Sequence, residues 1–247
     1  MISNILTITK RELRGYFGAP VAYVFIVIFL ILSGFFTMHV SKFYEAGQAE
    51  LRSFFIWQPW LCLFLVPSVA MRLWAEERRS GTIEILLTLP VTIGQAVVGK
   101  FLAAWLFIAI AFCLTFPLVL TVLHLGHPDL GPILAGYLGS LLLAGAYLAI
   151  GGFTSALTRS QVISFILAVV VCLFFVLAGW PPVTDALTKW LGAGSQVVAF
   201  VAALGFMPHF DSIQRGVLDS RDLLYYASLI FFMLCATTAV LHNRKAS

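Results

Sequence analysis

Long apolar runs alternate with short polar segments along the whole chain. Six of the runs reach the length of about 20 residues that a helix needs to cross the hydrocarbon core of a bilayer. They are Pro20–Val40, Ser53–Met71, Phe101–Leu123, Leu130–Leu157, Val162–Trp180 and Leu223–Leu241, and none contains Asp, Glu, Lys or Arg. The pattern predicts an all-α membrane protein with six transmembrane helices in a single domain over residues 1–247.

The segment ahead of the first run is amphipathic. Residues 4–17 mix apolar side chains with Lys10, Arg11 and Arg14, so they are too polar to cross a membrane and too apolar to dissolve in water. Such a pattern is typical of a helix that lies in the membrane interface. We therefore expect an interfacial helix at the N-terminus.

The segment ahead of the last run, residues 181–222, contains a shorter apolar stretch. Val197–Met207 is too short to cross a bilayer, which predicts a re-entrant or interfacial external hairpin. A seventh transmembrane helix is the alternative, and it would place Arg244 and Lys245 outside the cell.

Composition and charge agree with the membrane prediction. The chain is 61% hydrophobic and 11% charged, with a mean hydropathy of +0.99, whereas soluble domains carry roughly 25% charged residues. With the N-terminus in the cytoplasm, the inner segments hold ten Lys and Arg residues and the outer segments five, together the chain's fifteen. The excess of positive charge predicts cytoplasmic termini. Since the basic residues flank apolar runs, they do not indicate nucleic-acid binding. The four cysteines, with no CxxC pair, indicate neither a disulfide framework nor a zinc site.

Two polar clusters resemble ligand-binding motifs, one a phosphate-binding loop and the other a metal site, but the residues present do not favour either interpretation. Residues Gly94–Phe101 fall one position short of a P-loop, since Phe101 replaces the Ser or Thr that holds magnesium. Lys100 is better interpreted as a basic anchor at the start of the third run. The group His124, His127 and Asp129, with His209 and Asp211 farther on, is compatible with a metal site. Ordinary loop residues are the favoured interpretation.

The segment 72–100 is the longest that we expect to face the cytosol. Within it, Ser80 and Thr82 are possible N-caps, Glu84 falls in a first turn, and Pro90 stops a helix. Apolar residues, among them Leu87, give this stretch an edge that a solvated loop would not need. A short helix over residues 80–89, presented to a soluble partner, is one interpretation. A charge run beside a membrane helix is the other.

Two stretches of this chain carry a resemblance to a known family. Glu76-Glu-Arg-Arg-Ser-Gly-Thr-Ile-Glu-Ile-Leu-Leu-Thr-Leu-Pro90 and His209-Phe-Asp-Ser-Ile-Gln-Arg-Gly-Val-Leu-Asp-Ser-Arg-Asp-Leu-Leu-Tyr-Tyr226 are similar to the gliding-motility-type branch of the ABC type-2 permeases. The order of elements, with a coupling helix between the second and third spans, resembles that family over nearly the whole chain.

The resemblance implies an assembly and a site. It implies two permease subunits, identical or paralogous, above a pair of ABC ATPase subunits that bind ATP and magnesium, so that this chain holds no cofactor. The coupling interface would comprise Glu76, Glu77, Arg78, Gly81, Thr82, Glu84 and Leu87, braced by the N-terminal helix. It further implies a bacterial inner-membrane location in contact with membrane lipids, with room for an extra periplasmic or membrane subunit.

From these observations we expect the permease subunit of an ABC exporter for an amphiphilic cargo, with no catalytic activity of its own. An ion-coupled secondary transporter is the first alternative, yet such proteins place ionisable groups inside the membrane, and the six runs hold no Asp, Glu, Lys or Arg and only His39 at the edge of the first. A membrane scaffold that recruits a soluble partner is the second. A membrane enzyme is disfavoured, because no paired carboxylates or nucleophile–base set falls at the end of a span.

Overall fold

A computed structural model describes residues 2–46, 50–81, 91–126, 128–191 and 196–243 of the chain. Within these ranges every regular element is a helix. The helices are α1 (Ile2–Gly18), α2 (Pro20–Phe35), a π-helical turn η1 (Phe36–Val40), α3 (Phe43–Ala46), α4 (Arg52–Phe55), α5 (Gln58–Ala70), α6 (Arg72–Ser80), α8 (Ile93–Cys113), α9 (Phe116–Leu125), α10 (Leu130–Leu157), α11 (Gln161–Ala178), α12 (Pro181–Leu191), α13 (Gln196–Ala203), α14 (Phe206–Gln214) and α15 (Ser220–Asn243).

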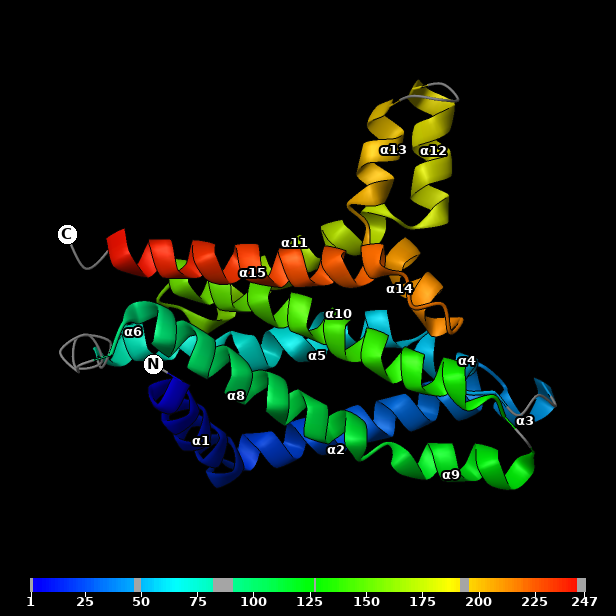
Figure 1. The fold of residues 1–247 in the computed structure, drawn as a ribbon, viewed down its shortest axis with the longest axis horizontal. Coiled ribbons are helices and arrows are strands. Elements are labelled where there is room, and N and C mark those ends of the chain that lie inside the picture. The colour runs from blue at the N-terminus through cyan, green and yellow to red at the C-terminus, as the bar shows by residue number, and fades with distance from the viewer. Residues whose placement is uncertain (1, 47–49, 82–90, 127, 192–195, 244–247) are drawn as a thin grey trace.

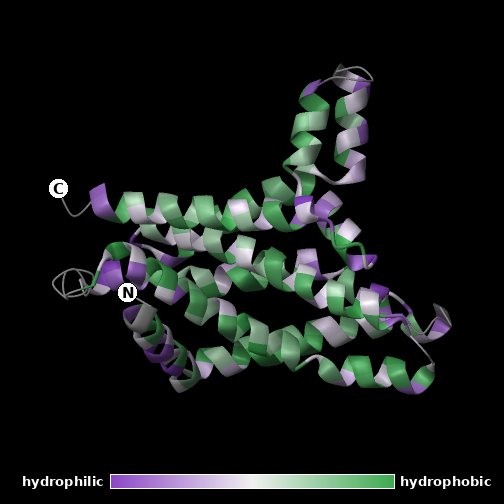
Figure 2. Ribbon diagram, in the orientation of Figure 1, coloured by the Kyte–Doolittle hydropathy of each residue, from purple (hydrophilic) through white to green (hydrophobic). Residues whose placement is uncertain are grey.

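The long helices lie side by side along one axis (Figure 1). The amphipathic α1, the last turns of α6 and the C-terminal turns of α15 gather at one end, here called the α1 end. The opposite end, called the α9 end, carries α3, α9 and α14. Hydrophobic residues cover the length of the bundle, whereas α1 and α6 are marked by hydrophilic positions (Figure 2). This distribution is the one expected of a protein that crosses a bilayer along the bundle axis.

Five segments are long and apolar enough to cross a membrane. They are Pro20–Glu45, Ile93–Leu125, Leu130–Leu157, Gln161–Ala178 and Ser220–Asn243. Because α1 and the end of α15 lie at the same end, the chain must pass along the bundle an even number of times. The remaining pass is made by α5 with α6, which lead back from the α9 end to the α1 end (Figure 1). The predicted class, an all-α membrane protein with six passes, is confirmed at this level.

The second predicted span is not one continuous helix. Two residues, Ile56 and Trp57, separate α4 from α5, and α5 itself has 13 residues. Pro59 stands in the first turn of α5, where a missing backbone N–H costs nothing, so the chain restarts its helix there. The buried α5 packs against α10 and α11. The prediction of an uninterrupted helix over Ser53–Met71 is therefore wrong.

The third predicted span has wrong bounds. Its helix begins at Ile93, eight residues before Phe101, and ends at Cys113, after which α9 restarts with Pro117 in its first turn. Thr92 starts α8 with a reciprocal capping box, in which its hydroxyl accepts from the Gln95 backbone N–H. Residues Ile93–Lys100, predicted as part of a cytosolic loop, are thus the first turns of a bundle helix.

The fourth predicted span coincides with α10, which forms the centre of the bundle. It packs against α5, α6, α8, α11, α14 and α15. Its small residues allow this close packing: a Cβ on Gly151 would lie 2.4 Å from the Ala70 Cβ, and one on Gly136 would meet the Phe55 ring. The prediction of a packed, bundle-facing helix is confirmed.

The region before the last span forms a helical hairpin. Helices α12 and α13 lie against each other and project sideways from the bundle (Figure 1). A bend of 59° then separates α13 from α14, which packs into the bundle through the buried rings of Phe206 and Phe210. Large apolar side chains remain exposed on the hairpin, namely Trp190, Val197 and Phe200. A hairpin with this exposed apolar surface fits the predicted re-entrant or interfacial element.

Candidate coupling site at the α1 end

Helix α6 is fixed to the end of α10 by hydrogen bonds that begin at its first turn. The Ser155 hydroxyl oxygen accepts from the backbone N–H groups of Trp74 (3.1 Å) and Ala75 (2.9 Å), and the hydroxyl donates to the Met71 carbonyl at 2.9 Å. The first N–H groups of a helix have no partner within the helix. Ser155 therefore caps α6 from a helix some eighty residues away in sequence.

A second bond joins the last turns of α6 to α10. Arg78, in the last turn, donates from Nη1 to the Ala156 carbonyl oxygen at 2.6 Å. Since α6 is held at its first and last turns, it must move together with the end of α10.

A buried ammonium group connects α6 to two further helices. Lys100 of α8 has a side chain that is 5% exposed, and its Nζ lies 2.6 Å from Glu77 Oε1 of α6 and 3.6 Å from Glu12 Oε2 of α1. Nζ also lies 5.2 Å from the centre of the Trp74 ring. A buried charge is stable only when opposite charges and hydrogen bonds replace its lost water. We call Lys100, Glu77 and Glu12 the Lys100 node.

Direct packing of α1 on α8 supports the Lys100 node. Gly99 leaves room for Ile8, whose Cγ2 atom would lie 2.8 Å from a Cβ at position 99. Thr9 donates from its hydroxyl to the Gly99 carbonyl oxygen at 3.1 Å. The Tyr16 ring stacks on Phe107 with 5.2 Å between centroids. The interfacial helix is therefore anchored to α8 along its buried face.

Helix α6 ends in a conformation that favours glycine. Gly81 follows Ser80 with φ +73° and ψ 2°, the left-handed region that side chains rarely adopt. The Ser80 hydroxyl donates back to the Glu76 carbonyl oxygen at 2.9 Å. Ser80 thus belongs to the last turn of α6, and the prediction that it caps a following helix is wrong. Thr82, Glu84 and Leu87 lie outside the described residues, and their role at a coupling interface stays a prediction.

The predicted site residues that the structure describes fall into two groups. Glu77 and Arg78 make contacts within the chain, to α8 and α10. Glu76 forms an exposed ion pair with Arg72 at 3.0 Å, and the basic residues of α1 face outward, namely Lys10, Arg11 and Arg14. The structure therefore places Glu77 and Arg78 together in contacts within the chain, and leaves Glu76 and the basic residues of α1 on the surface.

Sequence reasoning missed that Lys100 pairs with both Glu77 and Glu12. Lys100 stands between Val97 and Phe101 in an otherwise apolar stretch. A lysine in such surroundings needs a carboxylate from another segment, and this was the available signal. Because α8 begins earlier than predicted, this ionisable residue belongs to a spanning helix, near its end at α1.

The two alternative chemical clusters receive no support. All eight residues of Gly94–Phe101 are helical, so they cannot form the loop that cradles a phosphate. Asp129 caps α10 by accepting from the Gly131 N–H at 2.9 Å, and His209 lies 2.7 Å from Asp222. No group of three metal-binding side chains occurs among the described residues. His127 lies outside them.

The geometry defines a class of protein. It is a polytopic membrane protein in which the amphipathic N-terminal helix α1 and the short polar helix α6, at the end of the second pass, are joined by a buried ion cluster. A sequence profile described as "ABC-2 family transporter protein" matches residues 6–242. The chain belongs to the ABC-2 family, whose members are the membrane components of ABC transporters and work with an ATPase subunit. A search of curated proteins gives no match.

Proposed function

We propose that this chain is the permease subunit of an ABC exporter, and that α6 carries the motion of a separate ATPase into the bundle. The family match supports the role of membrane subunit. The direction of transport and the route of coupling are our proposals and go beyond the family match. ATP and magnesium would be bound by the ATPase.

The observation that carries the proposal is the Lys100 node. Helix α6 is bonded to α10 through Ser155 and Arg78, and to α8 and α1 through Lys100. A force on the segment after Gly81 would therefore reach four helices at once. An interaction that is buried and held by charges resists separation better than a surface contact does. A rigid group of helices with a glycine at its end is suited to act as a lever.

The surface charge at the α1 end supports contact with a cytoplasmic partner. Exposed basic side chains gather there, namely Lys10, Arg11, Arg14 and Arg79. Basic residues mark the cytoplasmic side of membrane proteins. We therefore place the α1 end, with both termini, on the cytoplasmic face of a bacterial inner membrane.

The proposal also covers the other subunits of the transporter and its cargo. A second permease copy or paralogue would complete the transport path, and one pair of ATPase subunits would dock beneath the α1 ends of the two permeases. An extra periplasmic or membrane subunit has room to join at the α9 end. The cargo that we propose is lipid-linked or otherwise amphiphilic, because the six apolar runs hold no Asp, Glu, Lys or Arg to bind a naked ion.

The test is to co-purify the chain with the ATPase encoded beside it, reconstitute the complex in liposomes and measure ATP turnover. Glu77→Gln removes one partner of Lys100. We expect it to leave the ATPase bound while lowering turnover by about tenfold, equivalent to about 1.4 kcal/mol. The matched control is Glu45→Gln, which removes an exposed pair with Lys42 at the α9 end.

Equal turnover in the wild type and both variants would overturn the coupling route. A complex that binds the ATPase and yet shows no turnover dependent on the permease would favour a scaffold instead.

A further inference from the structure

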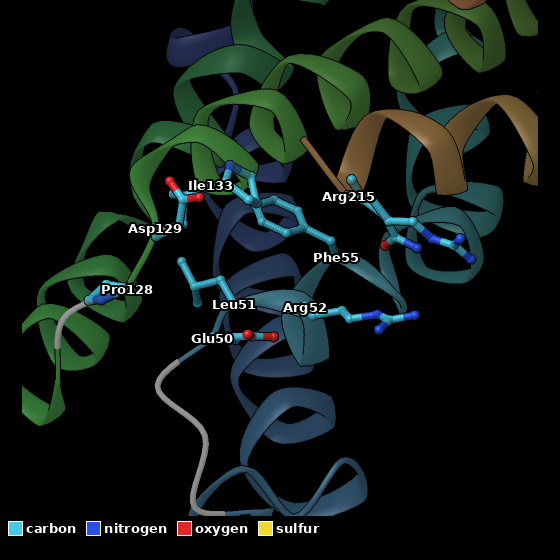
Figure 3. A pocket seen from close by; sticks show the side chains of 10 residues that line it. Glu50, Leu51, Arg52, Phe55, Pro128, Asp129, Ile133 and Arg215 are labelled. Atoms are coloured by element: carbon cyan, nitrogen blue, oxygen red, sulfur yellow. The ribbon is translucent and has the colours of Figure 1, made fainter. Parts of the chain in front are cut away.

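A cavity of about 230 Å³ opens at the α9 end, the end of the bundle opposite to α1 (Figure 1 and Figure 3). Three segments distant in sequence build it: residues 50–55 at α4, residues 128–133 at the start of α10, and residues 214–215 at the end of α14. Its floor is apolar, because Leu51, Phe55 and Ile133 are all buried. The cavity therefore combines an apolar base with polar side chains around it.

The walls of this cavity are fixed by close packing. Gly216, directly after α14, has φ +87°, and a Cβ there would lie 3.2 Å from Pro132 at the start of α10. The Phe55 ring occupies the space that a side chain at position 136 would need. The cavity is thus a preformed feature of the bundle, as ligand sites usually are.

Two guanidinium groups at the cavity are available to a ligand. Arg52 and Arg215 line it, both are exposed, and neither forms an ion pair within the described part of the chain. Figure 3 shows their side chains extending to the same side of the view, with Asp129 on the opposite side. Both arginines lower the pKa of Asp211, which burial raises above its usual value. Arginine pairs of this kind match the geometry of phosphate oxygens.

Negative charge also lines the cavity. The carboxylates of Glu50 and Asp129 belong to its wall, and both residues are outside the buried core. Gln214 backs the wall: it is 4% exposed and donates from Nε2 to Asp211, and its Oε1 is closed off from solvent. The polar groups open to a ligand are therefore the charged side chains, and the two carboxylates favour a cationic group.

We propose that this cavity binds a zwitterionic headgroup, with its phosphate at Arg52 and Arg215 and its ammonium group at the carboxylates of Glu50 and Asp129. The site is separate from the Lys100 node and its test does not involve the ATPase, so it stands or fails independently of the proposed coupling. The phosphate and ammonium belong equally to a phospholipid headgroup or to a free phosphorylated amine.

The test uses the full-length chain in detergent and isothermal titration calorimetry. The probes are dihexanoyl phosphatidylethanolamine below its micellar concentration and free phosphoethanolamine. Dihexanoyl phosphatidylglycerol, which has the phosphate but no ammonium, serves as the comparison. We expect saturable binding of at least one ammonium-bearing probe, and weaker binding of the glycerol lipid. Binding of the free amine as tight as that of the lipid identifies the headgroup alone as the ligand, whereas binding of the lipid only adds the acyl part; both support the site.

Variants locate the binding. Because each guanidinium would donate charge-assisted hydrogen bonds to the phosphate, Arg52→Gln and Arg215→Gln should each weaken binding at least about tenfold. Glu50→Gln, which removes a lining negative charge, should weaken binding of the ammonium-bearing probes as well. Arg221→Gln is the control, since Arg221 is exposed in the first turn of α15 and does not line the cavity. Equal affinity for the glycerol lipid, no binding of either ammonium-bearing probe, or equal losses at Arg221 would overturn the proposal.

Discussion

The two ends of the bundle treat their charged groups in opposite ways. At the α1 end, Lys100 is buried between two carboxylates, and Ser155 satisfies the first N–H groups of α6. At the α9 end, two arginines have no ion pair among the described residues, and the buried Gln214 Oε1 has no partner there. A buried charge whose partners lie within the chain favours a rigid arrangement, whereas a cavity lined by these two arginines is open to a ligand from outside. Four substitutions test this difference.

The largest effect is expected at Lys100. Lys100→Met keeps the length of the side chain but removes the buried positive charge that Glu77 and Glu12 share, so we expect a loss of about 3 kcal/mol in the free energy of unfolding. Thermal unfolding in detergent, followed by circular dichroism, measures it. Lys42→Met is the control, because the Lys42–Glu45 pair is exposed and should contribute less than about 1 kcal/mol. Losses of equal size at the two lysines would remove the distinction between the ends.

Ser155 should come next. Ser155→Ala removes the acceptor of two backbone N–H groups in a buried place, which we expect to cost about 2 kcal/mol. Hydrogen exchange at Trp74 and Ala75 should rise at the same time. Ser228→Ala provides the comparison, because the Ser228 hydroxyl is exposed and bonds only to the Tyr225 carbonyl of its own helix. If Ser155→Ala changed neither the free energy of unfolding nor the hydrogen exchange, Ser155 would not hold α6 against α10.

The packing of α1 on α8 gives a smaller effect. Gly99→Val would push against Ile8 and the Ile5 carbonyl, and we expect overpacking of about 1.5 kcal/mol together with faster proteolysis of α1. Gly94→Val is the matched control in the same helix, since a Cβ there meets nothing within 4 Å. If Gly99→Val and Gly94→Val gave equal losses of stability and equal proteolysis of α1, then α1 would not pack against α8 at Gly99.

The smallest effect is expected at the α9 end. Gln214→Leu replaces an amide whose oxygen is unsatisfied by a side chain of similar size, so stability should change by less than about 1 kcal/mol, in either direction. The same unfolding measurement applies. A loss as large as that from Ser155→Ala would show that the hydrogen bond from Gln214 to Asp211 supports the fold.

The sequence predicted the class and most of the passes because apolar runs without charge are a strong signal. The span Leu130–Leu157 was correct to the residue, since Asp129 caps its start and an Arg159-containing turn follows its end. The breaks near Ile56 and Leu114 were not predicted. Proline in the first turn of a helix continues a pass in a new direction without changing its hydrophobicity, so hydropathy alone does not reveal the interruption.

The candidate site was predicted only in part. Glu77 and Arg78 were singled out from a resemblance in sequence, whereas the contacts that position them come from α1, α8 and α10. Lys100 was assigned to a membrane surface because its run appeared to begin after it. Pairings between segments more than twenty residues apart depend on how helices pack, and no local pattern in the chain records them.

The central claim is that the end of α6 receives the motion of the ATPase. The most direct measurement is photo-crosslinking in the assembled complex, with p-benzoylphenylalanine placed at position 79, in the last turn of α6, or at position 217, exposed at the α9 end. We predict a crosslink to the ATPase from position 79 and none from position 217. A crosslink from position 217 alone, or from neither position in a complex that hydrolyses ATP, would contradict the account.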